Sequence, residues 1–460
     1  MKKSKLLFTL SIASLAVVPF AVSCSFDSKN DLYAKTDVAG IASLFKEKEQ
    51  EVQAAINTNH TKQMNVVLMT AGGKVDDLSF NQSVWEAVSQ FSEQTKNEMS
   101  SYVTPLNDSA VSKQYDNLII SDKNVWILTG FQHGYLFRDW LTGGGKNDEN
   151  LNTFAKSDIV VVGIDWVLEG LTKEQQEKIE GKIINLNYKT EEAGWMAGYA
   201  AANYLGAKFP GMSQEQRAKR GIAAFGGGPG KGVTDFITGF LSGIKKFNSE
   251  AENADKKALI TSTPISLDSG FDTQDASKIE LVKNITITNN PAIILPVAGP
   301  FTSSVVQAVK ASGANQSIIG VDTDQSKSFV DDKNIFFTSI EKRLGATVYR
   351  VLVDLFIKKE SSDIIGDFNK MPKNRNVKLG FWDGFTSLSK TSKEGEEQKM
   401  AQDSIDKAIN KFKEIVPKEK KEQAIKLLNI TEMSDTPKDG KTFKEYNETV
   451  LNKLITEINK

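Results

Sequence analysis

Residues 70–86 gather side chains suited to the non-covalent recognition of a flat, polar molecule. An aromatic ring, Phe80, and a carboxamide, Asn81, stand where an apolar run ends and a helical pattern begins. Ligands of open α/β sheets bind outside the carboxyl ends of the strands, beside helix N-termini. There Phe80 can stack on a flat ligand, and Asn81 can both donate and accept hydrogen bonds. The alternative is a hydrophobic staple followed by a turn residue, and this segment alone leaves both open.

The rest of the side-chain inventory offers little for covalent or metal catalysis. The chain has one cysteine, Cys24, and two histidines, His60 and His133, far apart in the sequence. Disulfides, thiolate metal sites and a Ser-His-Asp triad therefore lack their raw material. His133 is the one candidate general base of that kind, and a lone histidine is more often structural. We expect a binding protein that is not an enzyme and uses no cofactor.

Cys24 itself stands where a lipid anchor is expected. Three lysines within the first five residues precede an apolar stretch from Leu6 to Val22, and Ser23 precedes the cysteine. These are the parts of an export signal. The pattern resembles the bacterial lipobox, which implies that Cys24 is diacylated and becomes the first mature residue. The alternative, a membrane-spanning anchor, needs about 20 apolar residues, and this run is shorter. We expect a signal peptide at 1–23, a lipidated tether at 24–61 and attachment to the extracellular face of the cell membrane.

The body of the chain alternates short apolar runs with helical patterns, as parallel strands with crossover helices do. We expect strands at 65–70, 125–130, 159–164, 183–187, 221–225, 292–297, 317–321, 335–339 and 377–381, and helices at 81–99, 191–205, 233–247, 303–311 and 343–358. Ser79 and Gln82 have capping-box spacing, which places the start of the first of these helices. The alternation predicts an α/β architecture, and the number of strands fits two doubly wound lobes with a cleft between them.

Net charge and the C-terminal segment set further limits. The formal net charge is −1, which argues against a nucleic-acid partner held by bulk electrostatics. Residues 386–460 are highly charged and helical in pattern, with Ile405, Ile409 and Phe412 at helical spacing before Pro417. We expect a helical extension packed on the body, its apolar stripe serving as core contact rather than as a partner site.

Five segments together resemble the BMP (basic membrane protein) family of bacterial lipoproteins, the PnrA-like nucleoside-binding proteins of ABC importers. The segments occur in the family's order: Thr70–Glu86, Glu191–Ala201, Phe225–Gly243, Gly320–Gln325 and Thr338–Lys342. The likeness is greatest to mycoplasma members. It implies a type I periplasmic-binding-protein fold, in which two Rossmann-like lobes close on a ligand about a hinge. We expect the first lobe at 62–187 and 335–385 and the second lobe at 188–334.

The same resemblance implies which residues meet the ligand. Family members bind purine nucleosides between aromatic side chains, so Phe80 would be the stacking ring of the first lobe and Asn81 a polar contact. Asp322 would accept hydrogen bonds from ribose hydroxyls. Lys342 would be a donor at the cleft or the ion-pair partner of a carboxylate.

Three further residues complete the predicted ligand-binding set. They are Asp77 in the first motif, Gln132 after a Gly-Phe turn, and Gly299, where the lack of a side chain lets the backbone approach the ligand. The acidic residue that follows this turn in the family is displaced here to Asp139 or lost. Gln132 or His133 is its candidate replacement.

Other departures from the family pattern bear on specificity. Ala71 stands where the family has an aspartate expected to contact the ligand. The second stacking ring is unassigned, with Trp166 and Phe301 as candidates. The glycine-rich loop at 226–234 fits neither the P-loop nor the dinucleotide-binding pattern, which favours a permissive strand-to-helix turn at the edge of the cleft.

We therefore expect a monomeric, membrane-anchored receptor that captures a purine nucleoside for an ABC permease. One alternative is a surface adhesin that keeps the fold without transport; another is a binding protein for a different flat ligand, such as riboflavin. A third is an exported nucleoside hydrolase or phosphorylase. That enzyme would use the carboxylates Asp76, Asp77, Asp322 and Asp324, although no cluster among them has a clear metal-binding spacing.

Overall fold

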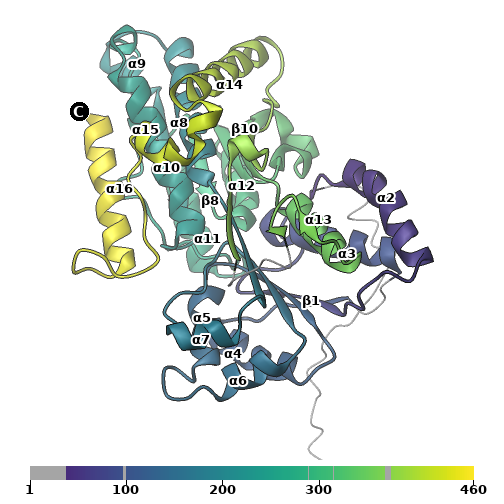
Figure 1. The fold of residues 1–460 in the computed structure, drawn as a ribbon. Helices are drawn as coiled ribbons and strands as arrows, with labels where there is room; N and C mark the ends of the chain where they lie inside the picture. Colours follow the sequence, from purple (N-terminus) through teal and green to yellow (C-terminus); the bar gives the residue numbers. More distant parts are fainter. Residues whose placement is uncertain (1–37, 97–99, 289, 314, 368–374) are drawn as a thin grey trace, which may run out of the picture.

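The computed structural model describes residues 38–96, 100–288, 290–313, 315–367 and 375–460. The chain forms two α/β lobes, each built around its own twisted sheet (Figure 1). Alternate residues of the central strands face separate cores: Val66 and Leu68 point to one, Val67 and Met69 to the other. Both faces of the sheet are therefore covered, as the continuous apolar runs predicted.

The first sheet is parallel throughout and has the strand order β13-β5-β4-β3-β1-β2. Its strands are β1 (Val66–Thr70), β2 (Ser101–Val103), β3 (Val125–Thr129), β4 (Val160–Ile164), β5 (Ile183–Tyr188) and β13 (Arg375–Leu379). The helices of this lobe are α2 (Ala42–Asn57), α3 (Phe80–Thr95), α4 (Asp108–Ile119), α5 (His133–Leu141), α6 (Glu149–Lys156), α7 (Lys173–Lys178) and α13 (Leu344–Phe356). A small antiparallel pair follows α13: β11 (Ser361–Ser362) and β12 (Gly366–Asp367).

The second sheet has the order β14-β10-β9-β8-β6-β7, and in it only β14 runs antiparallel among the strands described. Its strands are β6 (Gly221–Gly226), β7 (Leu259–Ile260), β8 (Ile293–Val297), β9 (Ser317–Asp322), β10 (Phe336–Lys342) and β14 (Thr386–Leu388). The helices are α8 (Thr190–Lys208), α9 (Gln214–Ala218), α10 (Lys231–Ser249), α11 (Ala276–Ile287), α12 (Thr302–Ser312), α14 (Glu396–Ile415), α15 (Ala424–Leu427) and α16 (Phe443–Asn459). Short 3-10 turns occur at Ala251–Asn253, Gly299–Phe301, Gln325–Lys327, Val330–Ile335, Phe381–Asp383 and Lys418–Gln423.

Three chain segments connect the lobes. The chain passes to the second sheet after β5, returns to the first lobe after β10, and passes back between β13 and β14. The expected boundary at residue 335 is therefore wrong, because β10 pairs with β9 in the second sheet. The part that returns to the first lobe comprises α13, the β11–β12 pair and β13, and α13 packs on α3 there. The sequence pattern did not show this because the strands of both sheets have the same apolar character.

The chain that precedes β1 packs on the first lobe. Helix α2 buries Leu44 and Val52 in the core that it shares with α3 and α13. The backbone N–H of Ala39 donates a hydrogen bond to the Glu86 carboxylate at 2.6 Å. The expected tether at 24–61 is therefore wrong over its second half, because this part is docked. The predicted signal peptide and Cys24 lie outside the described residues, and the described part of the chain contains no helix with the length and hydropathy of a membrane span.

Residues 386–460 form a helical extension on the second lobe (Figure 1), in which α14 lies against α8 and α16 against α10. Ile405 and Phe412 are buried in the core of that lobe, and Ile409 packs against it. The interpretation of this apolar stripe as core contact is confirmed. The extension begins with β14, a strand that the sequence did not predict. This strand pairs with β10 at the edge of the second sheet.

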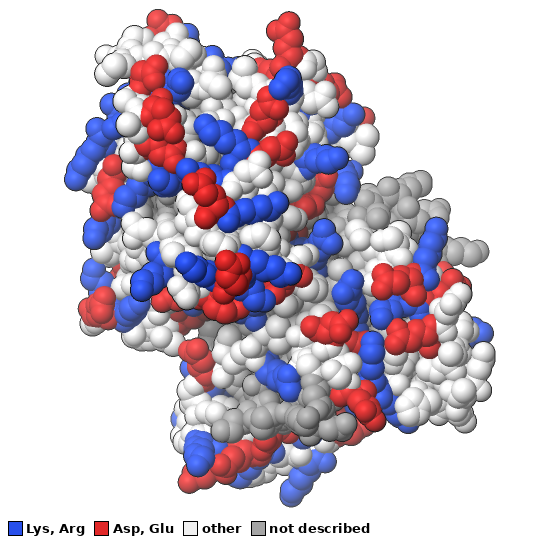
Figure 2. Space-filling view, turned by 45° about the horizontal axis from the view of Figure 1, so that its top comes forward, with Lys and Arg blue, Asp and Glu red and all other residues white. Residues whose placement is uncertain are grey.

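The surface carries both signs of charge. Figure 2 shows basic and acidic side chains interspersed over the face in view, in keeping with a formal net charge of −1. Because opposite charges so close together largely cancel at a distance, this face has no broad field of one sign.

Candidate ligand-binding site

A pocket lies between the lobes, at the carboxyl ends of both sheets. In each sheet the first strand sits between two later ones: β1 lies between β2 and β3, and β6 lies between β7 and β8. Ligands of doubly wound sheets bind at such switch points. Residues that follow β1, β3, β6 and β8 all line the pocket.

All the predicted ligand-binding residues border this pocket. They are Asp77, Phe80, Asn81, Gln132, Gly299, Asp322 and Lys342. They come from both lobes, so the fold brings together positions up to 265 residues apart, as the separation of Asp77 and Lys342 (342 − 77) shows. That each of them contacts a ligand stays a prediction.

Asp77 fixes the start of α3. Its carboxylate accepts hydrogen bonds from the backbone N–H groups of Ser79, Asn81 and Gln82, each at 3.0 Å. These donors would otherwise be unsatisfied at the helix N-terminus. The expected capping box is wrong, because Ser79 makes no side-chain cap bond and the side-chain Oε1 of Gln82 accepts from the Leu78 N–H at 3.1 Å instead. Burial raises the pKa of Asp77 to about 6 despite its three hydrogen bonds.

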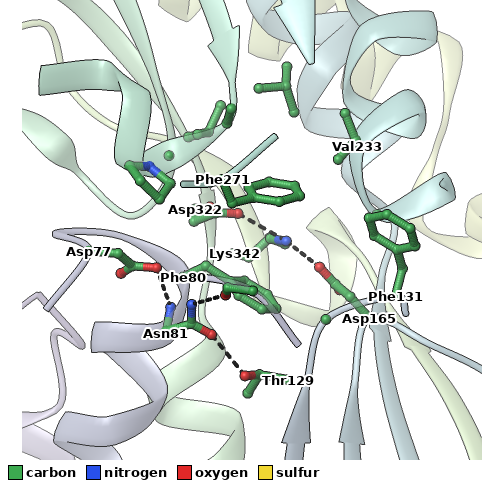
Figure 3. A pocket seen from close by; sticks show the side chains of 18 of the residues that line it. Asp77, Phe80, Asn81, Thr129, Phe131, Asp165, Val233, Phe271, Asp322 and Lys342 are labelled. Atoms are coloured by element: carbon green, nitrogen blue, oxygen red, sulfur yellow. Dashed lines mark hydrogen bonds and ion pairs between the residues drawn. The ribbon is translucent and has the colours of Figure 1, made fainter. Parts of the chain in front are cut away.

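Asn81 ties two strand ends together beneath the pocket. Its Nδ2 donates to the carbonyl of Gly72 at 3.1 Å, and its Oδ1 accepts from the Thr129 hydroxyl at 2.8 Å. A carboxamide has two N–H donors and two acceptor lone pairs. Asn81 therefore keeps the capacity to donate to and accept from a ligand while its own orientation is fixed (Figure 3).

Four phenylalanine rings line the pocket. Phe80 and Phe131 come from the first lobe, Phe236 and Phe271 from the second. In the view of Figure 3, Phe80 and Phe271 lie on opposite sides of Lys342. Rings of both lobes thus face one pocket, which is what stacking a flat ligand requires. Phe131, Phe236 and Phe271 were not predicted. A signal for Phe131 was present, because it lies in the Gly-Phe turn directly before Gln132.

The glycine-rich loop after β6 makes room for two of these rings. A side chain at Gly228 or Gly230 would collide with the ring of Phe131, and one at Gly227 would collide with Phe271. The loop lacks side chains where the aromatic rings pack against its backbone. Its glycines are thus explained by ring packing at a strand-to-helix turn.

A buried ion-pair cluster crosses the pocket. Lys342, the last residue of β10, is 3% exposed. Its Nζ lies 2.5 Å from Asp165 Oδ2, 2.9 Å from Asp322 Oδ1 and 4.7 Å from the ring centroid of Phe80. Burial alone would lower the pKa of Lys342, but the two carboxylates raise it above its ordinary value. The site therefore holds a charged ammonium, and the predicted carboxylate partner of Lys342 is present.

Asp165 is a site residue that the sequence reasoning missed. It follows β4 directly, as Asp322 ends β9, and both adopt a left-handed backbone conformation, with φ of +64° and +68°. Aspartate tolerates this conformation better than most residues. A carboxylate that directly follows a buried strand was the available signal.

The cluster also joins the lobes, because Asp165 belongs to the first lobe whereas Lys342 and Asp322 belong to the second. The Ser79 hydroxyl of the first lobe lies 3.0 Å from Asp322 Oδ2 and 3.1 Å from the carbonyl of Val321. A side chain at Gly299 would collide with Ser79. Contact between the lobes thus requires a glycine at position 299. We had expected this glycine to let the backbone approach the ligand, which is a different reason.

The candidate histidine is structural. His133 is fully buried; its Nδ1 lies 2.5 Å from the Tyr115 hydroxyl and its Nε2 lies 3.2 Å from the carbonyl of Met69. Burial lowers its pKa to about 3, so the ring is neutral. Asp139 lies on the surface, paired with Arg138. Of the candidate replacements for the family's acidic residue, only Gln132 reaches the pocket.

The two rings proposed as second stacking partners lie in the cores. Trp166 is buried in the first lobe and donates its indole N–H to the carbonyl of Leu128 at 2.9 Å. Phe301 is buried in the second lobe. Neither candidate ring lines the pocket. Ala71 is buried with its methyl group close to Gly130, so no carboxylate enters the site from that position.

The arrangement is suited to reversible binding. It combines aromatic faces, one ammonium, carboxylates and an oriented carboxamide. Within the described ranges, no group of three or more histidine, cysteine, aspartate or glutamate side chains is placed to hold a metal ion. Two doubly wound lobes that meet around such a pocket define a solute-binding protein of the type I periplasmic-binding-protein fold.

The chain belongs to the Bmp family, described as ABC transporter substrate-binding protein PnrA-like, whose model matches residues 64–421. It is 21% identical over 329 residues to the ABC transporter nucleoside-binding protein BmpA of Lactococcus lactis, covering 69% of this chain and 81% of that protein. It is 28% identical over 166 residues to Basic membrane protein C of Borreliella burgdorferi, a match that spans 36% of this chain and only 40% of that relative.

Solved structures agree on the fold. A solute-binding protein of an ABC transporter system from Aeropyrum pernix K1 superposes with a TM-score of 0.57 at 15% sequence identity. The match covers 86% of this chain and 98% of that one. The α/β fold expected from the sequence is confirmed.

Proposed function

We propose that this protein is a membrane-anchored receptor that captures a purine nucleoside and delivers it to an ABC permease. The observation that carries the proposal is the pocket itself, in which Phe80 and Phe271 offer aromatic faces from opposite lobes and Asp322 offers a carboxylate to hydroxyl donors. Family membership supports delivery to a permease. The name of the Lactococcus lactis relative supports a nucleoside.

The charge of the pocket favours nucleosides over nucleotides. Of the described residues that line it, three are carboxylates, Asp77, Asp165 and Asp322, and one is a lysine, Lys342. Lys342 is already paired with two of these carboxylates. A phosphate group would add negative charge without a free cation to receive it, whereas ribose hydroxyls can donate to carboxylate oxygens.

The test is ligand binding by the purified, unlipidated body. We expect guanosine, adenosine or inosine to raise the melting temperature and to bind in calorimetry, and GMP to bind far more weakly than guanosine. The variant Phe80→Ala should lose about 5- to 150-fold in affinity, since stacking on an aromatic ring contributes about 1–3 kcal/mol per base. Phe80→Leu serves as the control that keeps apolar volume but not the ring. Binding of riboflavin or thiamine with no response to any nucleoside would contradict the proposal.

The proposed location rests on Cys24 and the segment before it. A receptor that hands its ligand to a membrane complex gains from attachment, because diffusion would otherwise carry it away. Two acyl chains are sufficient for stable anchoring. Cys24→Ser should release the protein from the membrane fraction while leaving nucleoside affinity unchanged; retention of the serine variant would contradict the anchor.

A further inference from the structure

The last part of the chain lies beyond the residues that the family model matches, and it contacts the loop beside the ligand pocket. The family model ends at residue 421. Residues 422–460, here called the C-terminal arm, contain α15, an irregular stretch and α16. The apolar face of α16 joins the core of the second lobe through Leu451, Leu454, Ile455 and Ile458. This contact holds the arm against α10, the helix that begins at the pocket.

The arm supplies a cap that α10 lacks. The residue before α10 is Gly230, which has no side chain to accept from the first turn of the helix. Instead, Asp435 Oδ1 accepts a hydrogen bond from the backbone N–H of Lys231 at 2.7 Å. A carboxylate at a helix N-terminus satisfies a free donor and complements the helix dipole. The cap comes from 204 residues further along the chain.

A second contact holds the loop itself. Asn447 is fully buried, and its Nδ2 donates to the carbonyl of Pro229 at 2.8 Å. The same amide donates to the carbonyl of Ser434 at 2.8 Å and accepts from its N–H at 2.9 Å. Asn447 thus fixes the loop after β6 and the stretch that carries Asp435 at the same time.

The loop so held borders the ligand pocket and takes part in the contact between the lobes. Gly232, just after it, lines the pocket. The ring of Phe131, from the first lobe, packs where a side chain at Gly228 or Gly230 would be. Asp435 lines a neighbouring cavity that also borders Asp165 and Gly232.

A loop of glycines needs such support more than most loops do. Between β6 and α10 the residues are Gly227, Gly228, Pro229 and Gly230. Glycine loses more conformational entropy on ordering than any other residue. If the loop were still mobile when Phe131 closed onto it, the entropic cost of ordering the loop would reduce the free energy of ligand binding.

We propose that the C-terminal arm is a positioning element of the ligand site, in which Asp435 and Asn447 hold the glycine-rich loop ready for closure of the first lobe. The inference rests on the proposed ligand pocket. It assigns Asp435 and Asn447 a role in capture although neither belongs to the part of the chain that the family model covers.

The test compares Asp435→Ala and Asn447→Ala with Glu457→Gln, which removes a different contact of the arm with α10, the ion pair at 2.6 Å between Glu457 and Lys245. Two ligand-free measurements come first: hydrogen exchange of the amides at 226–232, and of those around Phe131 at 130–136. For the two alanine variants we expect faster exchange than in the wild type in both segments. For the control variant Glu457→Gln we expect the exchange rates of the wild type. Asp435→Asn, which keeps an acceptor oxygen, should restore slow exchange.

Binding of guanosine is the third measurement. The free energy that a helix cap contributes corresponds to a loss of guanosine affinity of about 2- to 30-fold in the alanine variants. We expect this loss mainly as faster dissociation of guanosine. Two outcomes would overturn the proposal. In the first, exchange is faster at 226–232 but unchanged around Phe131, and guanosine affinity is unchanged, so the arm is only a structural support. In the second, exchange is unchanged in both segments. If the wild-type protein binds no nucleoside, the function proposed above fails, and the exchange around Phe131 still decides the role of the arm.

Discussion

At the scale of residues, the site is organised around one buried ammonium. Lys342 bridges Asp165 and Asp322; its own side chain is 2% exposed and each carboxylate side chain is 10% exposed. Charges removed from water are tolerated only when they are paired and hydrogen-bonded. The cluster is thus a stable unit only while it is complete, and it also sets the charge that a ligand meets.

We expect Lys342→Met to destabilise the ligand-free protein by about 3–5 kcal/mol, because it leaves two buried carboxylates without their cation. Adding Asp165→Asn should recover part of this loss by removing one of the two charges. Urea unfolding of the wild type, both single variants and the double variant provides the measurement as a double-mutant cycle. Additive losses would mean that Lys342 and Asp165 are not coupled.

At the scale of elements, the second lobe depends on how closely α8 and α10 cross. A Cβ at Gly198 would lie 2.8 Å from the carbonyl carbon of Phe240, and one at Gly239 would collide with the backbone of Glu191. Both glycines lie inside helices, where glycine costs about 1 kcal/mol relative to alanine. Here that cost allows backbone contact between the helices, which places the start of α10 at the pocket and its side against α16.

Gly198→Ala should therefore destabilise the protein, although alanine is the better helix former. Overpacking costs about 1–3 kcal/mol, and a backbone neighbour cannot rotate away. Thermal unfolding without ligand is the measurement. Gly232→Ala is the matched control, since a Cβ there makes an ordinary contact at 3.5 Å. Equal melting temperatures for the two variants would contradict close crossing of α8 and α10.

At the scale of the whole molecule, direct bonds hold the lobes together across the pocket. Ser79 of the first lobe reaches Asp322 of the second, and Lys342 of the second reaches Asp165 of the first. A ligand that binds only between closed lobes shifts the population of molecules from the open toward the closed conformation. Bonds between the lobes lower the cost of closing before the ligand arrives.

Ser79→Ala should shift the ligand-free protein toward open lobes. A hydrogen bond to a charged group contributes about 1.5–3 kcal/mol, so the ratio of open to closed molecules should rise about tenfold or more. Small-angle X-ray scattering would show a larger radius of gyration, which saturating guanosine reverses. Ser249→Ala, which removes a bond within the second lobe, should leave the radius unchanged. A radius in Ser79→Ala equal to that of this control would mean that Ser79 does not hold the lobes.

The sequence alone determined what depends on local order along the chain. Apolar runs of strand length, helical periodicity and turn residues placed nine strands and five of the crossover helices, because burial on both faces leaves a direct imprint on composition. The first motif placed Phe80 and Asn81 at the pocket for the same reason: a strand end followed by a helix start is a local signal.

Only the tertiary structure decided what depends on residues brought together from distant parts of the chain. The short edge strands β2, β7 and β14 carry too few residues for a pattern, and the membership of β10 in the second sheet follows from its partner. The same holds for Asp165 beside Lys342, for Phe271 opposite Phe80, and for Asp435 at the start of α10. Each depends on packing between elements far apart in sequence, and such contacts leave no periodic trace in the sequence of either partner.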